Sequence, residues 1–295
     1  MKKIILLFAI MMIFNIVNAQ QKSKQINKKA PPVIKVNNAL EFVEAIGSNR
    51  IIQLEGNTIY LSDISSSKSG SNYRFDEELS DEHELVIFDV SNLKIIGFGL
   101  KPVKIITKPV HGDVLVFNNC SDIILENIDA GHGPEKGVCS GGVLNISDSK
   151  NISIKNSVLF GSGIEGITAE KVKNLNCNNT IIRGCTNSIM TLNNCTEIKF
   201  NDCEFNDNKD SDLINLSDCI NVTFSKCNIS NNRTGYSDEC YDYSIFNINQ
   251  SIGVKLEECN ISNNMSCYFS KKANSFDMKD CTLENNNFQK GNFKE

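Results

Sequence analysis

One glycine-rich stretch of this 295-residue chain, DAGHGPEKGVCSGGVLNIS at 129–147, brings together a histidine, a glutamate and a cysteine. His132 and Glu135 are residue types that exchange protons with substrates, and Cys139 is a residue type that attacks them or binds a metal. Such chemistry requires these side chains to converge. The alternative is an insertion between strands, in which Cys139 is buried and the glycines only shape the turn.

A second group of residues suits the cleavage of an acidic polysaccharide by elimination. That reaction uses carboxylates to bind Ca²⁺ and a basic residue to remove a proton. The candidates are Asp207, Asp210 and Arg233, with three further aspartates nearby in the sequence: Asp202, Asp212 and Asp218. The alternative is that these acids are solvated corner residues of a repeat that favours Asn and Asp at its turns. No cofactor is predicted except Ca²⁺ in the case of a lyase.

Tyrosines mark a third candidate site. Tyr236 and Tyr241 lie in the stretch NRTGYSDECYD at 232–242, and Tyr243 follows it. Tyrosine rings stack on sugars, and their hydroxyl groups form hydrogen bonds with them. This stretch and residues 131–141 interrupt the repeat as insertions, and such insertions often form the binding surface of a solenoid.

The repeat must position all of these candidates. Apolar residues alternate along each unit, which indicates a strand with one buried face. The first pair of columns contains Leu115, Leu144, Ile167, Met190, Ile214 and Phe246, and Phe117, Ile146, Ala169, Leu192, Leu216 and Ile248. After a turn, a second pair contains Ile123, Ile152, Leu175, Ile198, Val222, Val254 and Phe276, and Leu125, Ile154, Cys177, Phe200, Phe224, Leu256 and Met278.

The turn between these column pairs has a column of its own. It contains Asn92, Asp122, Asn151, Asn174, Glu197, Asn221 and Gly253. Asn and Gly tolerate left-handed backbone angles that other residues resist. We therefore expect the same tight corner on successive coils.

Short strands that recur about every 23 residues, without helical patterns between them, predict an all-β, single-domain parallel β-helix of roughly nine coils. A leucine-rich repeat is the alternative, because CTEIKFNDCEF at 195–205 fits that template. Two features oppose it: every coil has a second alternating pair, and the connecting segments are rich in Asn and poor in helix-forming residues.

The start of the domain predicts a cap for the solenoid. NNALEFVEAIG at 37–47 places Leu40, Phe42, Val43 and Ile46 along one helical face, and an Asn at 37 or 38 can cap the helix. An amphipathic helix here would cover the open end of the core.

Residues 1–19, MKKIILLFAIMMIFNIVNA, predict a secretory signal peptide, because two lysines precede an apolar run and small residues end it. The run is short for a membrane span, and no second run follows it. We therefore expect an exported protein that is periplasmic, cell-surface or secreted. Residues 20–36 are predicted to be a flexible leader, 37–288 the β-helix domain and 289–295 a polar tail.

The stretches IIQLEGNTIYL, VSNLKIIGFG and the Asn-rich coils resemble right-handed parallel β-helix proteins of the pectate-lyase-like superfamily. NIDAGHGPEKGVCSGGVL followed by LFGSGIEGI is similar to a segment of many bacterial β-helix proteins of unsettled function. The resemblance covers nearly the whole mature chain. It implies a right-handed β-helix, and the superfamily includes polysaccharide lyases, glycoside hydrolases, esterases, adhesins and repeat proteins without chemistry.

The letters Gly131-His132-Gly133 also match a motif of polygalacturonase-like hydrolases. That group carries paired aspartates one and two coils earlier, which act as general acid and base. The preceding coil here offers Asp113 alone. The match therefore lacks the acids that such a hydrolase requires.

Corner glycines at 131, 161 and 184 predict an alignment of His132, Ser162 and Cys185 along one edge of consecutive coils. Strict stacking would separate His132 from Cys185 by two rungs, about 9.6 Å. A direct hydrogen bond between them would therefore require the loops to fold together.

Seven of the twelve cysteines fall into two columns that they share with Ser, Thr and Val. The first column contains Cys203, Cys227, Cys259 and Cys281, and the second contains Cys120, Cys195 and Cys219. Free Cys packs as a small hydrophobic residue, so these columns predict buried ladders in tight corners. Cys240 and Cys267 lie outside the columns at comparable points of consecutive coils, and we predict a disulfide between them.

Together these features predict an exported β-helix protein that binds a polysaccharide or another cell-envelope ligand through residues 131–141 and 232–242, without a convincing catalytic set. The alternatives are a polysaccharide lyase or glycoside hydrolase, and a purely structural or adhesin-like solenoid. Loss of Lys2 and Lys3 with the signal peptide changes the formal net charge from −5 to −7. An acidic surface without a basic stripe argues against nucleic acid as a partner.

Overall fold

The computed structural model describes residues 30–76, 83–108, 111–133, 140–161, 163–235, 241–272 and 276–292. The predicted signal peptide, most of the predicted leader, and Glu135, Cys139, Ser162, Tyr236 and Cys240 lie outside these residues. The chain divides at Pro32, and the unit described below begins at Val33. None of the helices in the described part of the chain is long and apolar enough to cross a membrane.

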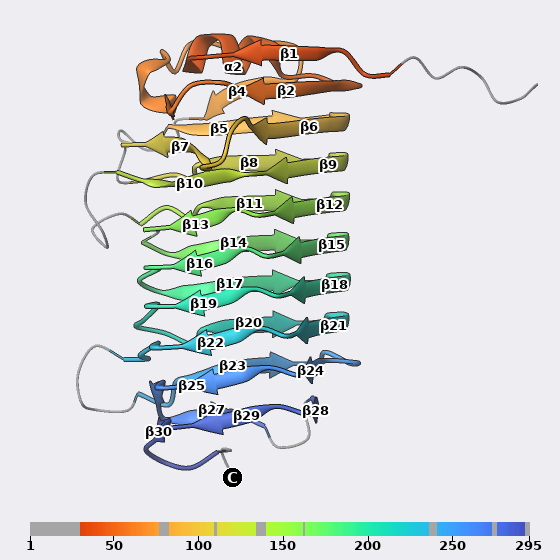
Figure 1. The fold of residues 1–295 in the computed structure, drawn as a ribbon. Helices are drawn as coiled ribbons and strands as arrows, with labels where there is room; N and C mark the ends of the chain where they lie inside the picture. The colour runs from red at the N-terminus through yellow and green to blue at the C-terminus, as the bar shows by residue number, and fades with distance from the viewer. Residues whose placement is uncertain are drawn as a thin grey trace, which may run out of the picture. The chain divides into compact units, whose positions relative to one another are not determined.

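Three long sheets, which we call A, B and C, form this unit (Figure 1). Sheet A contains β1 (Val33–Val36), β2 (Arg50–Leu54), β6 (Ser91–Gly97), β9 (Ser121–Glu126), β12 (Lys150–Lys155), β15 (Lys173–Asn178), β18 (Thr196–Asn201), β21 (Ile220–Ser225), β24 (Lys255–Glu257) and β28 (Asp277–Lys279). Sheet B contains β3 (Thr58–Tyr60), β7 (Val103–Thr107), β10 (Ile128–His132), β13 (Val158–Phe160), β16 (Ile181–Arg183), β19 (Glu204–Asn206), β22 (Asn228–Ser230), β25 (Asn260–Ser262) and β29 (Thr282–Glu284). Sheet C contains β4 (Tyr73–Asp76), β5 (Glu84–Phe88), β8 (Leu115–Asn118), β11 (Leu144–Ser147), β14 (Glu165–Glu170), β17 (Ser188–Asn193), β20 (Ile214–Ser217), β23 (Ser244–Asn249) and β27 (Tyr268–Ser270).

The fold is a right-handed parallel β-helix, and the chain passes from sheet C to A to B in each regular coil. Apart from β1, sheet A supplies nine strands within the described residues, which confirms the predicted nine coils. Neighbouring strands are parallel in all three sheets except for β4 and β5, which pair antiparallel. A pair of short strands, β26 (Met265–Ser266) and β30 (Asn287–Phe288), lies beside the last coils. Each regular coil has three strands, whereas the sequence pattern indicated at least two.

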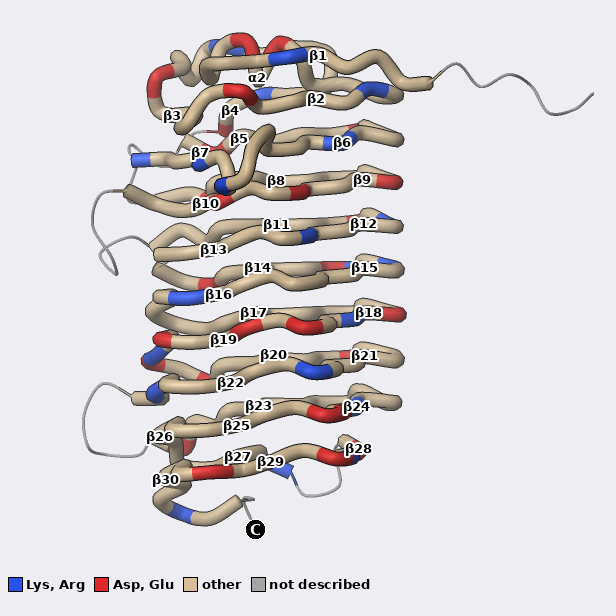
Figure 2. Tube along the Cα trace, in the orientation of Figure 1, with Lys and Arg blue, Asp and Glu red and all other residues tan. Residues whose placement is uncertain are grey.

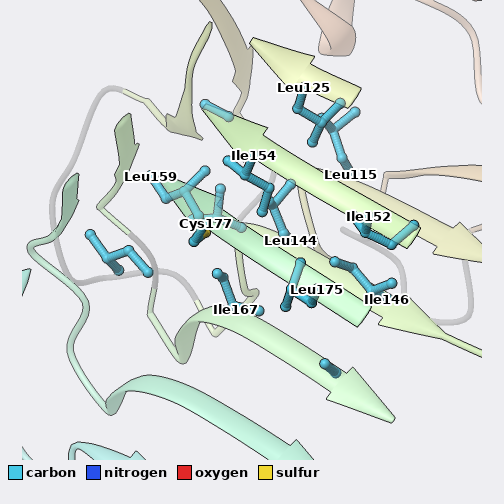
Figure 3. Close-up of a cluster of buried hydrophobic side chains, with 14 of the residues drawn as sticks. Leu115, Leu125, Leu144, Ile146, Ile152, Ile154, Leu159, Ile167, Leu175 and Cys177 are labelled. Carbon is cyan, nitrogen blue, oxygen red and sulfur yellow. The ribbon is translucent and has the colours of Figure 1, made fainter. Parts of the chain in front are cut away.

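The predicted columns are the walls of the core. Leu144 pairs with Leu115 on one side and with Ile167 on the other, and Ile152 pairs with Ile123 and Leu175. These side chains point inward and are buried, as Figure 3 shows for three successive coils. Period-2 alternation places every second residue in the core, so in-register stacking converts each sequence column into a continuous apolar wall.

The tight corners also match the prediction. Every residue of the predicted turn column has a positive φ, from 53° at Asn92 to 68° at Gly253. The left-handed region is accessible to Asn and Gly at low cost, which explains their recurrence at this corner.

The first coil is covered by α2 (Ala39–Ala45), with Asn38 as its N-cap accepting a hydrogen bond from the backbone N–H of Glu41. Phe42, Val43 and Ile46 are buried as predicted, but Leu40 is exposed, so its placement on the buried face was wrong. The helix is short, and Leu40 projects from its outer side. Strand β1 precedes the helix and pairs with β2, inside the segment predicted to be leader.

The last coil differs from the first. Met278 and Leu283 occupy core columns, opposite Leu256 and Ile261, yet they are 38% and 40% exposed. No further described strand of sheets A or B follows them. The apolar columns therefore reach solvent at this end of the described residues.

Candidate functional site

Both predicted insertions leave the solenoid at one corner, between sheets B and C. The first follows β10 and precedes β11, and the second follows β22 and precedes β23. The same corner is only a few residues long between β13 and β14 and between β16 and β17. The described residues that flank the two insertions therefore lie along one edge of the solenoid, as the sequence predicted.

A groove on the outer face of sheet B lies beside this edge. It has a volume of about 400 Å³, and we call it the aromatic groove; its lining residues are Thr58, Tyr60, Lys104, Ile106, Lys108, His132, Gly133 and Phe160. Tyr60 is 41% exposed, and the Lys108 ammonium lies 5.4 Å from the centre of its ring. Two aromatic rings and two lysines thus face one groove.

His132 forms the inner end of the aromatic groove but is only 4% exposed. Its Nε2 lies 3.0 Å from the backbone oxygen of Gly112, to which it can donate, while its Nδ1 has no hydrogen-bond partner in the described part of the chain. Burial lowers the pKa of His132, and the contacts with Gly112 and Asp113 only partly oppose this. The ring is therefore neutral at neutral pH, with one nitrogen engaged by the backbone.

A buried hydroxyl accompanies His132. Thr107 pairs with His132 in the register of β7 and β10, and its Oγ1 also lacks a hydrogen-bond partner among the described residues. Buried polar atoms are normally satisfied, so unpaired atoms on adjacent strands distinguish this end of the groove from the rest of the core.

Asp129 and Arg183 extend the polar character of sheet B beyond the groove. Burial raises the pKa of Asp129, while Lys104 and Arg183 lower it to a lesser extent. The Arg183 guanidinium lies 5.6 Å from the ring centre of Phe160. Gly131 leaves room for that ring, because a Cβ at this position would lie 2.8 Å from the nearest ring carbon.

A second groove lies in the corner itself, several coils further along. It has a volume of about 410 Å³, and we call it the basic groove; its lining residues are Gly184, Thr186, Asp207, Asn208, Lys209, Asn231 and Arg233. Lys209 and Arg233 pair in parallel across adjacent coils. The structure thus brings Asp207 and Arg233, two of the predicted lyase residues, to one groove.

Asp210 lies beside the basic groove rather than in its lining. Its Oδ2 lies 3.8 Å from Lys209 Nζ, and its backbone N–H donates to the carbonyl oxygen of Arg233. Burial raises the pKa of Asp210, against the opposing influence of Lys209 and Arg233.

The other aspartates of the predicted acidic group do not converge on this site. Asp202 lies at the corner between sheets A and B, and Asp218 lies at the corner between C and A. Asp212 is buried and accepts hydrogen bonds from Ser244, Asn247 and Lys271. Within the described ranges no group of three or more His, Cys, Asp or Glu residues could hold a metal ion.

The predicted alignment of the corner glycines was wrong by one residue. Gly131 pairs with Phe160, and Phe160 pairs with Arg183. Gly161 and Gly184 come one residue after Phe160 and Arg183. They therefore align with His132 and not with Gly131. Cys185 is fully buried, and its backbone N–H donates to Asn208, so its thiol faces neither groove.

The tyrosine and disulfide predictions concern the second insertion. The ring centres of Tyr241 and Tyr243 lie 6.4 Å apart, and Tyr241 is exposed. Cys267 is disulfide-bonded, its sulfur accepts a hydrogen bond from the backbone N–H of Asp242, and the other nine described cysteines form no disulfide. Its bonding partner lies outside the described residues, so the pairing with Cys240 stays a prediction.

A buried asparagine ladder in this corner was missed. Asn232 donates from Nδ2 to the carbonyl oxygen of Phe205 and to Asn264, and it accepts from Asn208. Asn286 continues the ladder beyond Asn264. The recurring Asn two residues after each of the last four sheet B strands was a signal for it, but a frequent residue in an Asn-rich repeat does not stand out.

The sequence also did not predict that Asp113 and Glu165, two carboxylates near the beginnings of β8 and β14, influence each other. Burial and the charge of Asp113 raise the pKa of Glu165, whereas a hydrogen bond from Thr191 lowers it. Asp113 accepts hydrogen bonds from the backbone of Gly142 and the side chain of Asn145. These bonds hold the Asp113 carboxylate to the next coil, so it has a structural role.

Comparisons with known proteins agree on the fold. No protein-family model and no curated protein sequence matches the chain. Among solved structures, ORF18 of Geobacillus virus E2 aligns with a TM-score of 0.55 at 11% identity, over 95% of this chain and 62% of that chain. The chain therefore spans about three fifths of the length of that phage protein.

Two further solved structures align less well. Pectate lyase Bsp165PelA from Bacillus sp. N165 has a TM-score of 0.49 at 12% identity, over 87% of this chain and 83% of the lyase. The surface adhesin PfbA of Streptococcus pneumoniae has a TM-score of 0.38 at 10% identity, over 88% of this chain and 82% of the adhesin. Identities this low concern the fold alone, so the alignments assign no activity to this chain.

Proposed function

We propose that this chain is an exported protein that binds an acidic polysaccharide of a cell envelope along the edge between sheets B and C. The observation that carries the proposal is the lining of the aromatic groove, where Tyr60 and Phe160 lie with Lys104 and Lys108. Aromatic faces stack on sugar rings, and ammonium groups bind the carboxylates of such a polymer.

The distribution of charge supports a chain-like ligand. Figure 2 shows basic segments along this edge, at the ends of β7 and β16 and beyond β19 and β22. Arg183 lies between the aromatic groove and the basic groove, since it contacts Phe160 and precedes Gly184. β22 is five strands from β7 in sheet B, so the cations extend over about 24 Å. On a protein with a net charge of −5, this local row of cations favours a polyanion.

Binding is favoured over hydrolysis by the state of His132. Its ring is buried, and its Nε2 faces the Gly112 backbone oxygen and not the open groove. A general base must lie within reach of a substrate proton. His132 is better placed to shape the end of the groove than to transfer protons in it.

The test is calorimetric titration with polygalacturonate, alginate and polyglucuronate, with neutral dextran as the comparison. We expect binding of at least one polyuronate, weakened by salt, and no binding of dextran. The double variant Lys104→Ala/Lys108→Ala should lower the affinity about tenfold. The matched control is Lys199→Ala, an exposed lysine on sheet A. Absence of binding to all three polyuronates, or equal effects of the control, would refute the proposal.

The second candidate function is elimination on an acidic polysaccharide at the basic groove. It is favoured by one observation, the presence of Asp207 and Arg233 in the same lining. Arg233 would remove the proton, and Asp207 would contribute to a Ca²⁺ site completed by the substrate. Incubation of the wild type with polygalacturonate and Ca²⁺ should release unsaturated products that absorb in the ultraviolet, and Arg233→Ala should not. A wild type without such products excludes this candidate.

A further inference from the structure

Asp212 accepts hydrogen bonds from two side chains that are themselves neighbours. Lys271 Nζ lies 2.5 Å from Asp212 Oδ2, and Asn247 Nδ2 lies 3.2 Å from the same oxygen. The side chain of Asp212 is 10% exposed and that of Lys271 is 27% exposed. An amine and a carboxamide are therefore held together on one partly buried carboxylate.

The register of sheet C places this lysine beside this asparagine. Phe246 of β23 pairs with Ser270 of β27, so Asn247 and Lys271 are the next neighbours across the two strands. The backbone N–H of Lys271 donates to the carbonyl oxygen of Phe246, which continues the ladder by one residue. Residues opposite each other on adjacent strands point to the same face, with their Cβ atoms about 5 Å apart.

We propose that Lys271 and Asn247 form an intramolecular isopeptide bond, with Asp212 as the catalytic residue that moves the proton. The Lys271 ammonium passes a proton to the Asp212 carboxylate, and the neutral amine attacks Cγ of Asn247. Asp212 returns a proton to the amide nitrogen as the C–N bond breaks. The products are one secondary amide and one ammonia molecule, which takes up the remaining proton to leave as ammonium, and no oxidant or other reactant is consumed.

Asn247 is a better acyl group for this reaction than Asp212 itself. Asp212 Oδ1 accepts hydrogen bonds from both the backbone N–H and the hydroxyl of Ser244, at 2.7 and 2.9 Å. Amide formation at Asp212 would expel one of its oxygens as water and would remove the carboxylate on which these contacts depend. Reaction at Asn247 leaves the carboxylate of Asp212 in place. Holding the reacting groups next to each other replaces a bimolecular encounter by a local one.

The bond would strengthen the end of the solenoid that packs least well. It would join the coil of β23 to the residue after β27, next to the last coil, where Met278 and Leu283 are exposed. The same region already contains the disulfide-bonded Cys267. Covalent links that close a loop restrict the unfolded chain, and the two links would act on neighbouring strands.

Mass spectrometry of the purified full chain tests the proposal. We expect the reduced wild type to be lighter than its sequence by the mass of one ammonia, and trypsin to leave Lys271 uncut within a branched peptide that contains Asn247. Lys271→Arg retains a positive charge beside Asp212 but should abolish the branched peptide. Asp212→Asn should abolish or slow its formation, because an amide does not accept the proton.

Lys272→Arg is the matched control. Lys272 Nζ lies 3.4 Å from Asn249 Oδ1. Lys272 and Asn249 are therefore a second neighbouring pair of a lysine and an asparagine on the same two coils. This variant should retain the branched peptide. Cyclisation of an amino-terminal glutamine also releases ammonia, and peptide mapping separates it because it yields no branch. A folded wild type without a branch would overturn the proposal, as would a branch that joins Lys271 to Asp212 with loss of water.

Discussion

The corners between sheets A and B and between sheets C and A are built differently from the corner between sheets B and C. In most coils the first two are tight, and each contains a residue with positive φ followed by a small residue, as at Asn156 and Ser157. Ser157 Oγ donates to the carbonyl oxygen two residues earlier, and the Cys203 thiol makes the equivalent contact. The two residue types alternate in these columns because they fill the same space and make the same contact.

The corner between sheets B and C has no such uniform rule. In the early coils it carries the insertion at 131–141 and the end of the aromatic groove, and in the later coils it carries the asparagine ladder and the basic groove. Between the strands of regular coils, this corner varies more in length than the other two, from four residues between β13 and β14 to thirteen between β22 and β23. The comparison shows that two corners keep the shape of the coil constant, whereas the third accepts insertions and can therefore form a binding surface.

The largest expected effect is on the asparagine ladder. Asn232→Ala removes an amide that bonds to Phe205, Asn208 and Asn264, and it leaves several of their buried polar groups unpaired. We expect a loss of about 3–5 kcal/mol in the free energy of unfolding, measured by guanidinium denaturation. The neighbouring, more exposed Asn231→Ala is the control. Equal losses in the two variants would show that the ladder is no stronger than an ordinary turn.

The tight corners offer a smaller effect of a different kind. Asn151 has φ of 56°, and Asn151→Val places a β-branched residue in the left-handed region. The expected loss is about 1–2 kcal/mol, whereas Asn151→Gly should cost about 0.5 kcal/mol or less. Equal stabilities of the Val and Gly variants would contradict the argument that backbone angle selects this column.

The aromatic groove predicts a dependence of stability on pH. Burial lowers the pKa of His132 below its ordinary value of 6.5, so the unfolded chain binds this proton more readily than the folded chain. The stability that the neutral His132 ring contributes is fully present above pH 6.5, and it is lost as the pH falls from 6.5 toward the folded-state pKa. The denaturation midpoint of the wild type should therefore fall more over this range than that of His132→Gln. Parallel curves for the two proteins would count against a buried, neutral imidazole.

The smallest effect on stability should come from the basic groove. Lys209 has a half-exposed side chain, and Lys209→Ala should change the free energy of unfolding by no more than about 0.5 kcal/mol. The same variant should weaken binding of polygalacturonate in calorimetric titration. A variant that lost stability but not affinity would assign Lys209 to the architecture of the corner instead of its surface.

Much of the candidate site was out of reach of the sequence. The insertions at 131–141 and 232–242 could be predicted, since they interrupt a regular column spacing. Tyr60 and Lys108 could not be assigned to a groove with Phe160, because the predicted columns cover the strands of sheets C and A and leave sheet B without a register. Asp202 and Asp218 seemed to belong with Asp207 because they are close in sequence, but successive corners of a coil point in different directions.

The sequence by itself determined the coil. Alternating apolar residues, a stack of Asn and Gly at one turn, and small residues at two corners specify which side chains are buried and where the chain bends, since each follows from local backbone geometry. Only the tertiary structure decided which side chains of different coils contact each other. The one-residue shift that places His132 beyond the paired Gly131, the approach of Arg183 to Phe160, and the convergence of Asn247 and Lys271 on Asp212 depend on strand register, which the hydrogen bonds between coils set.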